Sequence, residues 1–469
     1  MTTIGAIDTG IILIYLALMV VLGLYANRKQ VSVEDYFVAS GRIGTLSIAC
    51  LWLAGWVGGA SILGGAANAY KFGISAGWYL ASMALGCLLF GVFFAARIKR
   101  TGQQNSFLTY PEMMEARYDS RTRIVATITT IAAYVSYGAG QIAASALILQ
   151  TLLGMEFGTA LLLSAATIVL YTASGGFLAI TYTDWVQVGI LFFGIAVVGI
   201  PVAMLQGGTW SAVTGTLPAG HFDIGAWGWP TILALLVSIS LSFFTAMDSY
   251  TRSFAAKSEQ TARRGALIAA ALLLPLLAGT VWLGLSAKLL LPDLGDSGQA
   301  LTRLVMDYFP VGLKGLLLAG MLAALMSTAD ICILTASANA TRDIYQRYIN
   351  PQVEPKRLLH MSMAASAMIG LIAALMAWVM QDVINILLVA FTINSAALFL
   401  PTVAMVYFKR VSKPAAFWST SCALATVTGW YAMSRISDAA LFKLDPLWPG
   451  LFVSFLLFTA ISIADRERQ

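Results

Sequence analysis

The sequence predicts an all-α polytopic membrane protein, and two observations support this fold class. Of its 469 residues, 59% are hydrophobic and only 11% are charged, whereas about 25% of the residues of an ordinary soluble domain are charged. Long apolar runs recur along the chain, and each reaches the roughly 20 residues that a helix needs to cross a hydrocarbon core. The charged residues gather between these runs. A soluble enzyme, a nucleic-acid-binding protein and a secreted disulfide-linked scaffold are therefore all disfavoured.

The apolar runs accommodate thirteen transmembrane helices. In chain order, the expected spans cover residues 6–26, 45–70, 75–96, 124–153, 158–178, 182–205, 230–251, 266–289, 314–341, 359–380, 383–408, 414–433 and 446–464. The longest connections, at about 97–123 and 205–229, are too short for a soluble domain, so we expect one membrane unit. Residues 291–311 carry apolar residues at helical spacing, which favours a short surface helix there.

The basic residues predict the orientation of the chain. An odd number of spans puts the two termini on opposite sides of the membrane. With the N-terminus outside, 22 of the 28 Lys and Arg residues fall in cytoplasmic connections and six remain outside. Cytoplasmic loops normally carry such an excess. We therefore expect an integral plasma (inner) membrane protein with its N-terminus outside and its C-terminus in the cytoplasm. The net charge of +6 needs no nucleic-acid partner.

Cysteine and histidine usage argues against metal chemistry and catalysis. The four cysteines, Cys50, Cys87, Cys332 and Cys422, lie inside apolar runs and form no CxxC pair, and the two histidines lie in or beside connections. No cluster of base, nucleophile and orienting group is apparent. We expect no disulfide, no organic cofactor and no enzymatic activity.

The second span is unusually rich in glycine. It reads LWLAGWVGGASILGGAANAY, with Gly55, Gly58, Gly59, Gly64 and Gly65 near its middle. Such a helix is easily broken, and non-helical backbone at membrane depth occurs only where protein or a cavity surrounds it. Close packing through small residues is the alternative. Packing alone would not require the polar and aromatic residues interleaved with the glycines, so we favour a broken helix that lines a ligand site.

The ninth span carries polar groups on one face. At 100° per residue, a single stripe holds Ala324, Ser327, Thr328, Ile331 and Thr335, and Asp330 lies at its edge. Na⁺ is a hard cation that prefers oxygen ligands. Adjacent hydroxyls on a helix can supply two of them, while carbonyls of a broken helix supply others. The alternative is that the hydroxyls bond only to their own preceding turn.

Asp330, Asp184 and Asp248 lie in or at the ends of the ninth, sixth and seventh spans. A carboxylate inside a bilayer segment costs about 2.5–3.5 kcal/mol on insertion scales, so Asp330 is a functional candidate. Asp184 opens the sixth span after a GGFLAITYT turn and is expected near the hydroxyl stripe. Asp248 is interpreted as an interfacial residue paired with Arg252, four residues later.

The sequence resembles the sodium:solute symporter family of the APC superfamily. The likeness rests on SVEDYFVASGR (residues 32–42), GGFLAITYTDWVQ (175–187), AALMSTAD (323–330) and MDSYTRSFAAKSEQTAR (247–263). The resemblance implies a LeuT-like inverted repeat of five plus five helices. Residues 45–205 and 230–408 would form the two repeats, residues 1–44 an extra helix and cytoplasmic loop, and residues 409–469 two C-terminal helices.

The resemblance also implies a sodium site. Its ligands would be the carbonyls of Ala54, Val57 and Ala324 and the hydroxyls of Ser327 and Thr328. Some family members hold a second sodium ion with an aspartate at the position of Asp184 and with further hydroxyls. This chain departs from that pattern, because Asp330 and Ile331 stand where those members have hydroxyls. Asp184 and Asp330 are therefore candidates for a second cation or proton site.

The same architecture implies a solute site at mid-membrane. The candidate lining residues are Trp56, Gly58, Ser61, Ser82, Tyr134, Tyr137, Gln141, Phe243, Phe244, Thr392 and Asn394. No Lys or Arg is expected at that depth, which disfavours a di- or trianion. An amino acid, a sugar, a short monocarboxylate and a vitamin all remain candidates. The lead helix of the second repeat lacks Gly and Pro, so the sequence does not announce a break there, although Ser238, Ser240 and Ser242 could satisfy an unwound turn.

We therefore expect a sodium-coupled secondary active symporter that imports a small neutral, zwitterionic or monocarboxylate solute by alternating access. Its expected partners are Na⁺, the solute and the lipid bilayer, with a monomer as the functional unit. A proton-coupled symporter of the same fold is the main alternative. A sensor that binds its solute without transporting it is another.

Overall fold

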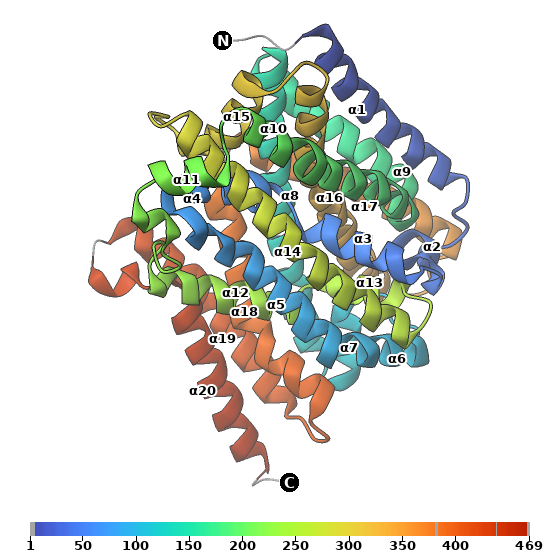
Figure 1. Cartoon of the computed structure of the whole chain (residues 1–469). Helices are drawn as coiled ribbons and strands as arrows, with labels where there is room; N and C mark the ends of the chain where they lie inside the picture. The colour runs from blue at the N-terminus through green and yellow to red at the C-terminus, as the bar shows by residue number, and fades with distance from the viewer. Residues whose placement is uncertain (1–4, 380–382, 438, 467–469) are drawn as a thin grey trace.

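The computed structural model describes residues 5–379, 383–437 and 439–466, and the regular elements within these ranges are helices. The parts of the predicted ranges at residues 1–4, 380–382, 438 and 467–469 lie outside the described residues. One isolated bridge pairs Ile43 with Ala256. In Figure 1, α1 begins at one end of the molecule and α20 ends at the opposite end.

The elements follow one another closely. They are α1 (Ala6–Asn27), α2 (Val33–Val38), η1 (Ala39–Gly41), α3 (Thr45–Trp56), α4 (Gly59–Phe72), η2 (Gly73–Gly77), α5 (Trp78–Phe93), α6 (Ala95–Asn105), α7 (Tyr110–Arg117), α8 (Ser120–Leu153), α9 (Phe157–Phe192), η3 (Phe193–Gly199), α10 (Ile200–Leu205), α11 (Trp210–Thr216), η4 (Ala219–Phe222), α12 (Trp229–Thr245), α13 (Met247–Ala255), α14 (Glu259–Leu290), η5 (Ser297–Gln299), α15 (Ala300–Tyr308), α16 (Leu313–Ala338), η6 (Asn339–Ile349), α17 (Pro355–Val379), α18 (Val383–Tyr407), α19 (Lys413–Ile436), η7 (Ala440–Lys443) and α20 (Leu447–Arg466).

Eight helices in the described residues are long and apolar enough to cross a membrane, or nine if the bent pair α12 and α13 forms one span. The count of thirteen stays a prediction. Two of the expected spans, 158–178 and 182–205, lie in one continuous helical run from Phe157 to Leu205, and the expected span 45–70 is interrupted after Trp56. The expected surface helix within 291–311 is confirmed as α15.

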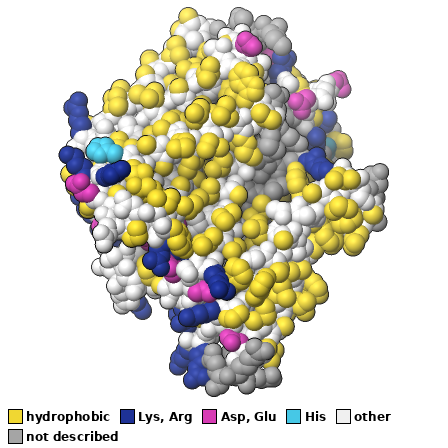
Figure 2. Space-filling view, turned by 180° about the vertical axis from the view of Figure 1, so that it is seen from behind, with side chains coloured by type: hydrophobic (Ala, Val, Ile, Leu, Met, Phe, Trp, Pro, Cys, Tyr) yellow, Lys and Arg dark blue, Asp and Glu magenta, His cyan; other side chains and the backbone are white. Residues whose placement is uncertain are grey.

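Helix α16 lies at the centre of the fold. It packs against α1, α3, α8 and α9, and nearly all of its side chains are buried. Hydrophobic side chains spread across the middle of the face in Figure 2, whereas most of the Lys and Arg visible there lie toward its left and lower edges. An apolar exterior around a buried helix that carries a few polar side chains suits a bilayer, because polar groups must find partners inside the protein.

Two helices break where function is expected. The predicted break in the second span is confirmed: α3 ends at Trp56, Val57 has φ −88° and ψ 77°, and α4 begins at Gly59. The second break follows Thr245, where Ala246 adopts an extended conformation and α12 and α13 meet at a bend of 47°. Both breaks leave backbone groups outside the helical pattern and available to other partners.

A charged network fixes the short helix α7. Arg123 forms ion pairs with Glu115 at 2.5 Å and with Asp343 at 2.6 Å, and Arg347 pairs with Glu115 at 2.7 Å. Burial alone would raise the pKa of Glu115, but hydrogen bonds from the two arginines lower it below its usual value. The network holds α7 against the start of α8 and against η6.

Gly176 permits a kink in α9 that no other residue would allow. Its φ of 50° and ψ of −146° lie in a region that only glycine occupies readily, and a Cβ there would lie 2.6 Å from the carbonyl oxygen of Tyr36. We expect Gly176→Ala to lower the free energy of unfolding by about 2 kcal/mol, because backbone strain and a clash coincide. Thermal unfolding of the purified protein in detergent measures this.

Gly189 on the same helix is the matched control. A Cβ at Gly189 meets nothing within 4 Å, so alanine there should leave the unfolding midpoint unchanged or raise it slightly. Equal midpoints for the two alanine variants would contradict a requirement for glycine at the kink.

Candidate cation and solute site

The break in α3 faces the hydroxyl stripe of α16. Ser327 Oγ donates a hydrogen bond to the carbonyl oxygen of Ala54 at 2.9 Å, and Thr328 Oγ1 donates to the same oxygen at 3.2 Å. Both hydroxyls also lie within reach of the Ala324 carbonyl, at 3.3 and 3.1 Å. The structure thus brings together four of the five residues expected to bind sodium, and we call this group the oxygen cage.

Val57, the fifth expected residue, lies at the break itself. Its N–H donates to the carbonyl of Leu53 at 2.8 Å, and its ψ of 77° takes its own carbonyl out of the helical direction. The side chain of Val57 is fully buried. The conformation of Val57 therefore turns its carbonyl away from the axis of α3.

Each hydroxyl of the oxygen cage is suited to a cation. A hydroxyl has one hydrogen to donate and two lone pairs that can accept. Ser327 and Thr328 can therefore keep a hydrogen bond to the Ala324 carbonyl while their lone pairs face an ion beside Ala54. Such a set of neutral oxygens suits a hard monovalent cation better than a soft transition metal.

Gly58 is required for the close approach of three helices at the break. A Cβ on Gly58 would lie 2.8 Å from Gln141 Oε1 and 2.9 Å from Thr328 Oγ1. Gln141 Oε1 in turn accepts a hydrogen bond from the backbone N–H of Gly59 at 3.0 Å. Gln141, expected as a solute ligand, therefore caps the first turn of α4 with its side-chain oxygen.

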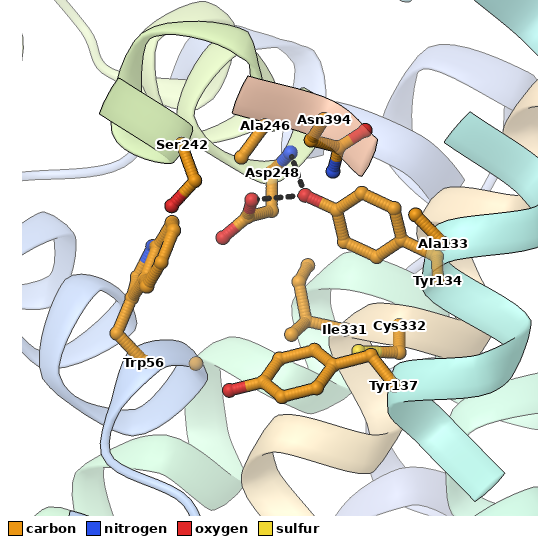
Figure 3. Close-up of a pocket in the computed structure, with 11 residues that line it drawn as sticks. Trp56, Ala133, Tyr134, Tyr137, Ser242, Ala246, Asp248, Ile331, Cys332 and Asn394 are labelled. Atoms are coloured by element: carbon orange, nitrogen blue, oxygen red, sulfur yellow. Dashed lines mark hydrogen bonds between the residues drawn. The ribbon is translucent and has the colours of Figure 1, made fainter. Parts of the chain in front are cut away.

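A cavity opens beside the break. Its volume is about 20 Å³, and it receives side chains from α3, α8, α12, α13, α16 and α18, as Figure 3 shows. Its lining residues are Gly55, Trp56, Ala133, Tyr134, Tyr137, Ser242, Ala246, Asp248, Ile331, Cys332 and Asn394. In this structure the cavity holds little more than a water molecule. Its walls combine aromatic rings with a few polar groups, a lining typical of small-molecule sites.

Some of the expected solute residues line this cavity and others do not. Trp56, Tyr134, Tyr137 and Asn394 belong to its lining, and Phe243 stacks on the indole of Trp56 with ring centroids 3.7 Å apart. The other expected solute residues do not line the cavity.

Four further candidates lie outside the cavity lining. Ser61 donates to the Trp56 carbonyl at 3.3 Å, and Ser82 donates to the Trp78 carbonyl of its own helix at 2.7 Å. Phe244 packs edge-on against Phe94, at 4.8 Å between centroids. Thr392 is buried.

Asp248 and Arg252 correct two expectations. Their ion pair is confirmed, but both residues are buried, at 3% and 1% exposure, and Asp248 lines the cavity instead of lying at the membrane interface. The expectation that no Lys or Arg lies at the depth of the site is wrong, because the Arg252 guanidinium reaches Gly55 of α3. The bend after α12, which the sequence does not announce, turns α13 into the protein.

Tyr134 completes this corner of the cavity. Its hydroxyl donates to Asp248, and the backbone N–H of Asp248 donates back to the Tyr134 oxygen at 3.1 Å. Figure 3 shows the Asp248 carboxylate directed between Trp56 and Tyr134. The only sequence signal for this residue was its i,i+4 spacing to an arginine at the end of an apolar run.

A second polar cluster lies between α1, α9 and α16. Asp330 is fully buried, and the Tyr171 hydroxyl donates to its Oδ2 at 2.8 Å. Asp184 is 1% exposed and lies near enough for its charge to interact with that of Asp330. In the described part of the chain, Oδ1 of each carboxyl is buried without a hydrogen-bond partner. A bound cation or proton would offset the charge of two such carboxyls.

The chain is similar in sequence and in fold to known proteins. The model of the sodium:solute symporter family matches residues 36–422. The chain is 26% identical to a sodium/proline symporter of Haemophilus influenzae, over 97% of this chain and 94% of that protein. It is 28% identical to a sodium/pantothenate symporter of Escherichia coli, over 95% and 94%. A solved Na⁺-coupled sialic acid symporter, in a substrate-bound outward-open state, has a TM-score of 0.85 at 20% identity, with 98% of each chain covered.

Proposed function

The chain belongs to the sodium:solute symporter family, and we propose that its oxygen cage binds the Na⁺ that drives uptake of a small organic solute. The protein is a membrane-embedded, sodium-coupled symporter and not an enzyme. The observation that carries the proposal is the convergence of the Ser327 and Thr328 hydroxyls on the Ala54 carbonyl, at the point where α3 stops being helical.

The proposed ligands of this ion are the carbonyls of Ala54, Val57 and Ala324 and the hydroxyls of Ser327 and Thr328. The ion would fasten the broken α3 to the rigid α16. Because α3 also supplies Trp56 to the cavity wall, an ion that fixes the break also orders the solute site. Ion and solute then tighten each other's binding by the same factor. The membrane potential adds about 2.3 kcal/mol per charge per 100 mV to inward movement.

Asp184 and Asp330 form the proposed second cation or proton site. Support comes from their burial, from their mutual interaction and from the unpartnered oxygen on each. A carboxyl at position 330 adds a negative charge that interacts with Asp184. It therefore favours tighter cation binding or a bound proton. The proton-coupled alternative draws its support from this cluster alone.

The proposed solute site is the cavity bounded by Trp56, Tyr134, Tyr137 and Asn394. The charge of Asp248 in its lining is neutralised by the ion pair with Arg252 behind it. A neutral or zwitterionic solute, or one with a single carboxylate, therefore fits better than a multiply charged anion. Proline, pantothenate and glucose, named for similar symporters, are the first compounds to test.

We also propose the finer topology. Thirteen spans would place residues 45–205 and 230–408 in two inverted repeats, with the first helix of each repeat broken. The breaks after Trp56 and Thr245 support this arrangement, because they occupy corresponding positions in the two ranges. The N-terminus would lie outside and the C-terminus in the cytoplasm, and a single chain would be the functional unit.

Uptake into proteoliposomes tests the proposed function. The purified chain is supplied with labelled L-proline, D-pantothenate, D-glucose and sialic acid, under an inward gradient of Na⁺ alone or of H⁺ alone. We expect one compound to accumulate with the Na⁺ gradient and to leak out when a sodium ionophore collapses it. Accumulation driven by the H⁺ gradient and indifferent to Na⁺ would instead support the proton-coupled alternative.

A further inference from the structure

Arg252 of α13 contacts the last turns of α3 at three positions. Its Nε–H donates to the carbonyl of Leu51 at 2.9 Å, and its guanidinium carbon lies 5.0 Å from the ring centre of Trp52. A Cβ on Gly55 would lie 1.9 Å from Arg252 Nη2, so glycine is needed there to let the guanidinium approach. Three contacts from one side chain thus hold the turn that ends in the Ala54 carbonyl.

The other end of this side chain reaches the solute cavity. Arg252 Nη1 is ion-paired with Asp248, whose carboxylate lines the cavity and accepts a hydrogen bond from Tyr134. A continuous path of contacts therefore runs from Tyr134 on α8 through Asp248 and Arg252 on α13 to Leu51 and Gly55 on α3. The oxygen cage begins at the carbonyl of Ala54, the residue immediately before Gly55.

The alternative explanation is that the ion pair only stabilises the fold. Buried ion pairs are weak evidence for that role, because apolar replacements of similar volume are often neutral or stabilising. A purely structural pair also gives no reason for Arg252 to contact Leu51 and Trp52 of α3, or for Gly55 to leave space for its guanidinium.

We infer that Arg252 is a positioning residue for the oxygen cage, and that its pairing with Asp248 makes the geometry of the cage depend on the solute cavity. The inference rests on the proposed function, since it assigns to Arg252 the placement of a proposed sodium ligand. A solute that contacts Asp248 or Tyr134 changes the contacts that the Arg252 guanidinium makes with α3. The Ala54 carbonyl moves with that turn, so solute and ion are linked through one side chain.

Direct binding of ²²Na⁺ to the purified full-length protein tests the inference without knowledge of the solute. Arg252→Lys keeps the charge but loses the planar fork that bonds Leu51 and Asp248 together. Gly55→Ala keeps Arg252 but displaces its guanidinium. We expect each variant to raise the half-saturating Na⁺ concentration about tenfold, the range typical of a coupling between sites. The double variant Asp248→Asn/Arg252→Gln, which leaves no unpaired buried charge, should do the same.

Arg264→Lys, an exposed arginine at the cytoplasmic end of α14, is the control and should bind ²²Na⁺ as the unaltered protein does. If Arg252→Lys and Gly55→Ala both bind Na⁺ with unchanged affinity, the inference is wrong, whatever their effect on yield or thermal midpoint. If the unaltered protein itself binds no Na⁺, the proposed function is wrong, and the inference that rests on it is wrong as well.

Discussion

The double variant Ser327→Ala/Thr328→Ala is expected to lose sodium-driven solute accumulation. It removes both hydroxyls that face the Ala54 carbonyl and leaves only backbone oxygens around the proposed ion. Hydrogen bonds and dipole contacts to a charged group contribute about 1.5–3 kcal/mol each. The half-saturating Na⁺ concentration should therefore rise at least about 100-fold. Initial rates of uptake into proteoliposomes, measured against external Na⁺ at constant ionic strength, give this value.

Ser337→Ala is the matched control for this variant. Ser337 lies on the same helix, is fully buried, and donates its hydroxyl to the Leu334 carbonyl at 2.8 Å. Losing that hydroxyl should leave the sodium response intact. If the double variant accumulated solute with an undiminished response to external Na⁺, the oxygen cage could not be the coupling site.

Asp330→Asn is expected to change the cation requirement of transport. The asparagine oxygen can still accept the hydrogen bond from Tyr171, so the helix contact survives while one of two buried charges disappears. We expect the half-saturating cation concentration to rise about tenfold, corresponding to about 1.4 kcal/mol, and the number of charges moved per solute to fall. Simultaneous measurement of current and labelled solute in proteoliposomes gives that ratio.

The variant Tyr171→Phe distinguishes the role of the Asp330 carboxyl from the role of its hydrogen bond to Tyr171. It retains Asp184 and Asp330 and removes only the hydroxyl that donates to Asp330. A charge-to-solute ratio that stays normal in Tyr171→Phe and falls in Asp330→Asn supports a coupling role for the carboxyl. Unchanged cation dependence and stoichiometry in Asp330→Asn would remove Asp330 from the mechanism.

The features of the site that the sequence predicted are local ones. A helix with five glycines near its middle can hardly stay regular, and its break indeed falls between Trp56 and Gly59. The positions of Ser327 and Thr328 on one face of α16 follow from helical geometry alone. Their meeting with Ala54 depends on which face of α16 packs against α3, and that pairing came from the family resemblance.

The second break shows where local patterns fail. The sequence from Thr231 to Tyr250 holds neither Gly nor Pro, yet the helix stops at Thr245. The carbonyl of Phe244, freed by the break, accepts a hydrogen bond from the Tyr250 hydroxyl at 2.7 Å. The serines that the sequence suggested for this role point elsewhere: Ser242 bonds back to Ile239, and Ser240 bonds to Ser82. Instead, the side chain of Tyr250, beyond the bend, supplies the hydrogen-bond donor for the freed carbonyl.

Asp248 and Arg252 were misplaced for the same reason. As a pair at i and i+4 near the end of an apolar run, they fit an interfacial helix end. Only the bend after Ala246, together with the glycine at position 55 on another helix, makes room for them in the interior. The number of spans was harder still, because consecutive apolar runs such as 158–178 and 182–205 join into one helical run whose kink at Gly176 is a tertiary feature.

Thermal unfolding in detergent with Na⁺ or K⁺ at equal ionic strength tests the central claim most directly, because it requires no knowledge of the solute. A cation that binds only the folded protein stabilises it according to its concentration and dissociation constant. We predict that the unfolding midpoint rises with Na⁺ but not with K⁺, and that the Ser327→Ala/Thr328→Ala variant shows no such rise. Equal midpoints in the two salts, or a sodium-dependent rise that survives in the double variant, would contradict a sodium ion held between α3 and α16.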